Sequence, residues 1–182
     1  AWQQAGLAPL TMAVNVSAVQ FAHGDWTATV AATLAETGLA PACLQLELTE
    51  SVLMKDPAAA TQTLAALRAT GVRLSIDDFG TGYSSLAYLK RFPLDELKID
   101  RSFIDGLPDD TEDAAIVHAI LQLARSLGLD TVAEGVETEA QRRFLHAHGC
   151  TAIQGWLYAP ALPAAAAFER LHPAGGARQA AG

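Results

Sequence analysis

Cysteine is nearly absent from this sequence, and its scarcity restricts the class of protein. The two cysteines, Cys43 and Cys150, lie far apart and form neither a CxxC pair nor a Cys/His metal-ligand spacing. Disulfide frameworks and structural zinc sites need paired or closely spaced ligands, so both are disfavoured. We therefore expect two buried thiols in a reducing compartment, with the cytoplasm as the location.

Basic residues are also scarce. The sequence has 12 Lys and Arg against 20 Asp and Glu, a formal net charge of -8 and a pI near 5.0. A protein that binds nucleic acid without sequence preference needs a basic face to displace counterions from the phosphates. The charge balance therefore predicts no DNA partner. An anionic ligand would need a metal ion or a few local cations.

Long apolar runs and an amino-terminal leader are missing as well. No run approaches the roughly 20 residues of a membrane-spanning helix, and no basic and apolar leader opens the chain. We expect no membrane segment here. The chain opens without Met, and Gly6 has the place of a helix stop. This start predicts that a preceding segment has been cut away, and an anchor in that segment could tie the full protein to a membrane.

Apolar residues, in contrast, make up 51% of the 182 positions, which is enough for one sizeable core in a single domain. Helix-like segments with N-cap residues at Asp25, Asp56 and Thr138 alternate with strand-like ones. The expected strands are residues 12–17, 43–50, 72–79, 96–103, 130–137 and 152–159. This alternation predicts an α/β fold with a parallel sheet, doubly wound or closed as a barrel, with ligands at the carboxyl ends of the strands.

The longest expected helix lies between Glu112 and Gly128. Its apolar residues at helical spacing predict one buried stripe, made of Ile116, Ile120, Leu123 and Leu127. The last residues, 173–182, are rich in Gly and Ala with little to bury, so we expect a disordered tail after a domain of residues 1–172.

Polar residues alternate with the apolar ones inside each strand, and they collect toward the strand ends. If the apolar faces meet the helices, the polar faces point into the middle of the sheet or barrel. An interior filled only for stability would carry Val, Ile and Leu there, so the polar positions indicate a functional site. In the fifth segment Glu134 breaks the alternation, and Gly135 can supply the bend that turns it inward.

Each of these polar residues also has an ordinary explanation. Asp77 and Asp78 could serve a solvated turn, and Asn15 could be a satisfied core amide or a turn former. Lys98 could be a surface cation or the partner of Asp100. Glu47 and Glu50 could cap the next helix. Together, however, Asn15, Glu47, Asp77, Asp78, Asp100 and Glu134 bring oxygen ligands from separate strand ends, with Lys98 as one cation among them.

Oxygen ligands without His or Cys suit Mg²⁺ or Mn²⁺ rather than Zn²⁺. Adjacent carboxylates such as Asp77 and Asp78 repel each other, so a cation or several donors should stabilise them. The histidines fall on expected helices or loops, and we interpret them as surface or packing residues: His23, His118, His146, His148 and His172.

Six motifs in order resemble one known family: NVSAVQF, ELTES, DDFGTGYSSL, LKIDRSFI, AEGVET and QGWLYAPAL. They are similar to the EAL domain, the bacterial phosphodiesterase module that acts on cyclic di-GMP in signal transduction. The resemblance covers residues 1–172 and implies an eight-stranded, TIM-like (β/α)8 barrel. About six of those strands are expected here, because the segment with the Glu-Ala-Leu signature is absent.

The resemblance also implies roles for single residues. Asn15, Glu47 and Asp77 match ligands of a first metal ion, and Asp77, Asp78 and Glu134 match those of a second. The ions would be Mg²⁺ or Mn²⁺, with Ca²⁺ as an inhibitor. Lys98 would hold the attacking water or a phosphate oxygen and Asp100 would orient it, while Glu134 is the alternative general base. The resemblance implies that Gln154 contacts the substrate, that Glu50, Thr81 and Gly82 belong to a flexible loop and its anchor, and that Glu137 is a supporting residue.

The implied reaction is metal-dependent hydrolysis of cyclic di-GMP to linear pGpG. A non-catalytic receptor for the same dinucleotide and a protein-interaction domain remain alternatives. The family implies a homodimer when the domain is complete, and fusion to upstream sensory or GGDEF-type domains. We expect the present chain alone to be weakly active or inactive.

Overall fold

A computed structural model describes residues 2, 5–22, 25–82 and 86–172 of the chain. Its framework is a six-stranded parallel sheet in which the strands lie side by side in sequence order. The strands are β1 (Met12–Asn15), β2 (Leu44–Thr49), β3 (Arg73–Phe79), β4 (Glu96–Ile99), β5 (Asp130–Ala133) and β6 (Ala152–Ile153). All six expected strands are therefore confirmed, although all except β3 end earlier than the segments expected for them.

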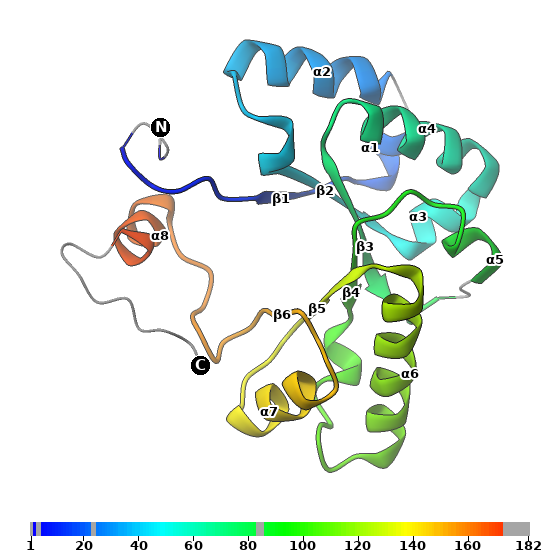
Figure 1. Ribbon diagram of the computed structural model, residues 1–182, viewed down its shortest axis with the longest axis vertical. Helices are drawn as coiled ribbons and strands as arrows, with labels where there is room; N and C mark the ends of the chain where they lie inside the picture. The colour runs from blue at the N-terminus through cyan, green and yellow to red at the C-terminus, as the bar shows by residue number, and fades with distance from the viewer. Residues whose placement is uncertain (1, 3–4, 23–24, 83–85, 173–182) are drawn as a thin grey trace.

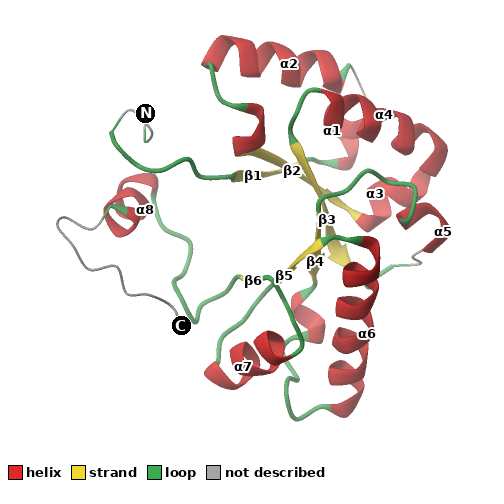
Figure 2. Ribbon diagram, viewed as in Figure 1, coloured by secondary structure: helices red, strands yellow, loops and turns green. Residues whose placement is uncertain are grey.

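Helices connect the strands and lie mainly on one side of the sheet. They are α1 (Ala18–Ala22), α2 (Trp26–Thr37), α3 (Glu50–Lys55), α4 (Pro57–Ala69), α5 (Leu86–Leu89), α6 (Thr111–Leu127), α7 (Glu139–Ala147) and α8 (Ala164–Leu171), with short 3-10 turns η1 (Pro41–Cys43) and η2 (Arg101–Phe103). Figure 1 shows α2 to α6 on the convex side of the curved sheet and α8 on the opposite side. The alternation and curvature in Figure 2 confirm an α/β fold in the form of an incomplete barrel.

The core lies between the sheet and its helices. The outward-facing residues Leu48, Leu74 and Leu97 are fully buried, and Leu64 and Leu67 of α4 pack in the same cluster. Removing this apolar surface from water is the main favourable term in folding. The expected N-caps also form: Asp25 and Asp56 accept hydrogen bonds from the backbone N–H groups of Ala28 and Ala59.

The buried stripe of α6 differs from the expectation. Val117, Ile120, Leu121 and Ala124 are buried, while Ile116 is 40% exposed and Leu123 and Leu127 are half-buried. Apolar residues of α6 form two neighbouring faces at helical spacing, so the sequence allows either face to be buried. Packing against the sheet buries the face centred on Val117. Of the two expected buried thiols, Cys43 is buried and Cys150 is half-buried.

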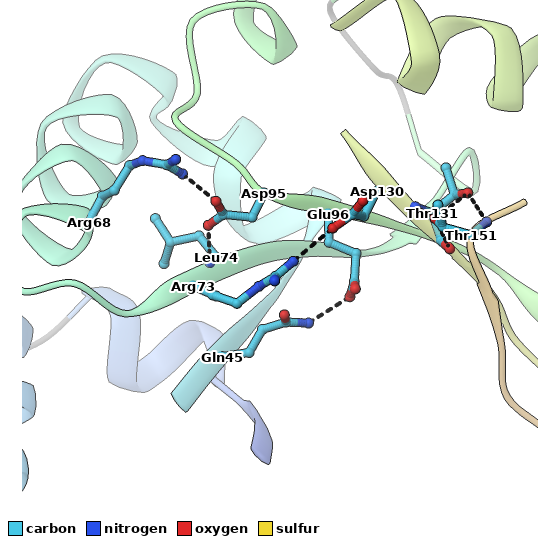
Figure 3. A network of polar contacts seen from close by, with 9 residues as sticks. All are labelled: Gln45, Arg68, Arg73, Leu74, Asp95, Glu96, Asp130, Thr131 and Thr151. Carbon is cyan, nitrogen blue, oxygen red and sulfur yellow. Dashed lines mark hydrogen bonds and ion pairs between the residues drawn. The ribbon is translucent and has the colours of Figure 1, made fainter. Parts of the chain in front are cut away.

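Polar contacts tie the amino ends of the strands together. Figure 3 shows Gln45 donating to the Glu96 carboxylate at 2.6 Å and Arg73 pairing with Asp130 at 2.9 Å. On the helix side, Asp95 joins Arg68 to the backbone N–H of Leu74. These bonds fix the relative heights of β2 to β5, and therefore the positions of the side chains at the opposite, carboxyl ends.

Among the described helices, none combines the length and the apolar character needed to cross a membrane. The expected disordered tail, residues 173–182, and His23 lie outside the described residues.

Candidate metal centre

Three carboxylates from three different strands meet at the carboxyl ends of the sheet. Glu47 lies in β2, Asp77 in β3 and Glu134 directly after β5. Parallel register brings these ends together, because Thr49 of β2 pairs with Asp77 and the Glu134 N–H donates to Ile99 at the end of β4. Gly135 has a φ of 72°, a conformation that favours glycine, and the chain turns there so that Glu134 faces inward as expected.

Lys98 of β4 stands at the middle of this group. Its ammonium nitrogen lies 2.9 Å from Glu47, 3.0 Å from Asp77 and 2.7 Å from Glu134. An ammonium group has three donors, so each can serve one carboxylate. The lysine is only 4% exposed, so the sequence alternative of a surface cation is wrong.

The pKa values reflect this crowding of charge. Burial by itself lowers the pKa of Lys98, but the hydrogen bonds that its ammonium donates to Glu134, Glu47 and Asp77 outweigh burial and raise the pKa above its ordinary value. Burial raises the pKa of Glu134, against the opposing effect of Lys98. Burial also raises the pKa of Asp78, assisted by the negative charges of Asp77 and Asp100. The centre therefore holds more negative charge than one lysine balances.

Asp78 adopts an unusual backbone conformation beside Asp77. Its φ is 53°, which is uncommon outside glycine, and its N–H donates to the Asp77 carboxylate at 3.1 Å. Asp77, Asp78 and Glu134 each offer an oxygen, and the three oxygens lie within 4.8 Å of one another. Hard oxygen ligands at this spacing, with excess negative charge, fit Mg²⁺ or Mn²⁺. The residues present therefore suit the metal that the motifs imply.

The loop after β3 is tied to α3 through Glu50. The Glu50 carboxylate is buried and accepts a hydrogen bond from the Gly80 N–H at 3.1 Å. A Cβ at Gly82 would lie 3.2 Å from the same carboxylate, so glycine allows the close approach. Thr81 donates from its hydroxyl to the Asp78 carbonyl at 2.8 Å. These contacts join the loop directly to the carboxylate group.

The remaining expected site residues lie around this group. Asn15 ends β1 and pairs in register with Glu47, and Gln154 follows β6. Both Glu47 and Gln154 line a cavity of 420 Å³ inside the curved sheet, together with Lys98. Asp100 accepts from the Ser102 backbone and hydroxyl, and among the described residues no hydrogen bond or ion pair joins it to Lys98.

The sequence analysis did not identify Arg73 and Glu96, which begin β3 and β4 and lie on the inner side of the curved sheet. Both line the same cavity at its amino-terminal side. The signal was present, because Arg73 shares the parity of Asp77 in β3 and Glu96 shares that of Lys98 in β4. Glu137, the expected supporting residue, contacts the segment that follows β4. It pairs with Arg101 at 2.8 Å, on the turn after β4.

Comparisons with known proteins place this geometry in a family. The model for the EAL domain matches residues 1–161. The chain is 53% identical over 163 residues to the bifunctional diguanylate cyclase/cyclic di-GMP phosphodiesterase MucR of Pseudomonas aeruginosa. The aligned region covers 90% of this chain and 24% of MucR. The chain therefore spans about a quarter of the length of this curated relative.

Solved structures agree with the fold. The PaMucR phosphodiesterase in complex with c-di-GMP aligns with a TM-score of 0.88 and 52% identity, over 91% of this chain and 67% of that one. BlrP1 of Klebsiella pneumoniae, in a manganese and cy-diGMP complex, aligns with a TM-score of 0.77 and 33% identity, over 85% of this chain and 40% of that one. A calcium complex of the same protein also aligns.

Proposed function

Because the chain belongs to the EAL domain family, we propose that the protein carrying it hydrolyses cyclic di-GMP to linear pGpG with divalent metal ions. The observation that carries the proposal is the convergence of Glu47, Asp77 and Glu134 on Lys98 at the carboxyl ends of the strands. Two relatives that align with most of this chain are named as phosphodiesterases of that dinucleotide.

We assign the metal ligands to two overlapping sets. Asn15, Glu47 and Asp77 form the first, and Asp77, Asp78 and Glu134 form the second. The oxygens of the second set already lie within 4.8 Å of one another. When bound by these residues, Mg²⁺ or Mn²⁺ would supply a nucleophilic water at neutral pH and would neutralise charge on the phosphate. Ca²⁺, with its longer bonds and looser geometry, should bind here and support turnover poorly.

The side chains around these ligands orient the reactants. The ammonium group of Lys98 contacts the same carboxylates. Once these carboxylates bind metal ions, the ammonium group is placed to donate to the attacking water or to a phosphate oxygen. Glu134 is the alternative group to accept a proton. Asp100 supports the same edge of the site through the turn that it caps, and Gln154 reaches the substrate from β6.

The loop after β3 contacts both α3 and the proposed metal ligands. Glu50 holds Gly80 and approaches Gly82, while Thr81 is bonded to Asp78. A shift of this loop therefore moves a residue next to Asp77. We propose that the loop couples the metal ligands to contacts made elsewhere by the complete protein, including those of a homodimer.

Most of the curated relative lies outside the region matched by this chain, and its printed name includes a cyclase activity. We propose that this protein also carries further signalling domains of the sensory or GGDEF type. These domains would control the hydrolysis carried out at the metal centre.

The test is hydrolysis by the full-length protein with Mn²⁺, followed by chromatographic separation of cyclic di-GMP from pGpG. Asp77→Asn should lose most turnover while keeping its fold, because a neutral amide cannot hold two cations. Asp56→Asn is the matched control, since Asp56 caps α4 away from the site and Asn is an equally good cap. That variant should keep wild-type turnover.

Near-normal hydrolysis by a folded Asp77→Asn protein would remove Asp77 from the mechanism. Wild-type protein that binds the dinucleotide but yields no pGpG would replace the phosphodiesterase with a receptor. Neither binding nor product would favour the protein-interaction domain instead.

A further inference from the structure

An exposed aromatic residue stands beside the metal centre. Trp156 lies in the turn after β6 and its side chain is 68% exposed. A lone exposed aromatic needs no explanation. Here, however, the guanidinium carbon of Arg101 lies over the indole, 5.9 Å from the ring centroid. An arginine over one face of a tryptophan attracts it and fixes its orientation.

Arg101 is itself held in place by acidic neighbours. Its Nη2 lies 2.8 Å from Glu137 and its Nε lies 3.1 Å from Asp105. The guanidinium therefore has partners on two sides, and the indole lies against a group with little freedom to move. Fixing an aromatic surface in advance lowers the entropy cost of binding a ligand to it.

Two glycines make room for this arrangement. A Cβ at Gly135 would lie 2.4 Å from Cγ of Arg101, so a side chain there would displace the arginine. A Cβ at Gly155 would lie 2.2 Å from the carbonyl oxygen of Val136. The turn bearing Trp156 is also bonded to Val136, whose N–H donates to Gln154 at 3.0 Å and whose carbonyl accepts from Leu157 at 3.0 Å.

Each part of this arrangement adjoins a residue of the metal centre. Arg101 follows Asp100 in sequence, and Gly135 follows Glu134. Trp156 comes two residues after Gln154, which lines the cavity inside the sheet. The turn that carries the indole therefore follows the carboxyl end of β6, at the same edge of the sheet as the metal centre.

We infer that Trp156, held by Arg101, is a stacking surface for one purine base of the dinucleotide. The inference rests on the proposed function, and it assigns a substrate-binding role to a residue outside the metal ligands. Stacking of a base on an aromatic side chain contributes about 1–3 kcal/mol. Because the base lies away from the reacting phosphorus, this energy is the same in the ground state and the transition state, and it affects KM rather than kcat.

The test compares steady-state hydrolysis of cyclic di-GMP by Trp156→Ala, Trp156→Phe and wild type. Trp156→Ala should raise KM roughly 5- to 150-fold, as stacking energies imply, with kcat within about twofold. Trp156→Phe should recover part of the loss because it keeps an aromatic face. Tyr158→Ala is the matched control, since Tyr158 is exposed in the same segment, and among the described residues its ring has no arginine over it.

Fluorescence gives a second readout that does not depend on turnover. In a protein with Trp2→Phe and Trp26→Phe, Trp156 is the remaining tryptophan. Titration with pGpG, which carries the same bases, should quench its emission, because a stacked purine contacts the indole directly.

The outcomes separate the two proposals. A wild-type protein that hydrolyses the dinucleotide, with unchanged KM in Trp156→Ala or no quenching of Trp156, overturns this inference and leaves the proposed function standing. A wild-type protein that neither binds nor hydrolyses the dinucleotide overturns both.

Discussion

A single residue, Lys98, balances much of the negative charge at the centre of this molecule. Its ammonium group lies within 3.0 Å of three carboxylates that come from three different segments. A buried carboxylate without a partner is costly, and breaking a buried ion pair by removing one partner is more damaging than never forming it. Lys98 therefore supports the fold of the centre as well as its proposed chemistry.

Lys98→Met tests this structural role. Removing the ammonium group leaves Glu47, Asp77 and Glu134 crowded without a cation, so the free energy of unfolding should fall by about 3–5 kcal/mol. Urea denaturation in the presence of EDTA measures it. Arg142→Met is the control, because Arg142 pairs with Glu139 on the exposed face of α7 and its loss should be barely measurable. Equal effects in the two variants would contradict the account.

The same residue shows what a sequence can and cannot give. Polar parity in the strands placed Lys98, Glu47 and Asp77 on the inner face, because side chains in a strand alternate strictly. Parity could not show which acid would pair with the lysine. Asp100 was an obvious partner by sequence distance, yet the structure pairs Lys98 with Glu47, 51 residues away. That choice depends on the register of neighbouring strands, which the sequence leaves open.

Among the helices, α7 is the clearest case of local sequence fixing local structure. Thr138 and Gln141 form the expected capping box, with the Thr138 hydroxyl accepting from the Gln141 N–H. Gln141 goes further than its motif implies. Its amide also donates to the carbonyl of Ile104 at 3.0 Å, in a buried position, which attaches the start of α7 to the turn after β4.

This second bond predicts unequal costs for the two capping residues. Thr138→Ala should lower the free energy of unfolding by about 1 kcal/mol, the usual cost of losing an N-cap. Gln141→Ala should cost about 2–3 kcal/mol, because it also leaves a buried carbonyl without its donor. Thermal or urea unfolding of both variants measures the difference. A Gln141→Ala protein no less stable than Thr138→Ala would mean that the Ile104 bond contributes nothing.

Helix α6 shows where element-level prediction failed. The expected stripe included Ile116, which is partly exposed, and omitted Val117, which is fully buried. Neighbouring apolar residues gave two acceptable faces, and tertiary packing decided between them. Caps such as Thr138 are predictable because they depend on a few adjacent residues, whereas the buried face depends on the sheet that the helix covers.

At the scale of the whole molecule, the order of strands and helices was predictable and the curvature was not. Alternating apolar segments allow a parallel sheet that is either open or closed, and only the resemblance to a family selected the barrel. The structure shows a curved sheet with its strands in sequence order, and one cavity bounded by all six of them. That curvature brings Ala13 of β1 and Gln154 beyond β6 into the lining of the same cavity as the Glu47 carboxylate.

The central claim is that the carboxylates around Lys98 bind divalent metal ions. The most direct measurement is isothermal titration of the full-length protein with Mn²⁺, comparing wild type, Asp77→Asn and Asp56→Asn. The account predicts two Mn²⁺ per chain for wild type and for Asp56→Asn. It predicts loss of binding, or at least 10-fold weaker binding, in Asp77→Asn, because we assign Asp77 to both proposed ligand sets. Folded Asp77→Asn protein that binds Mn²⁺ with wild-type stoichiometry and affinity would contradict it.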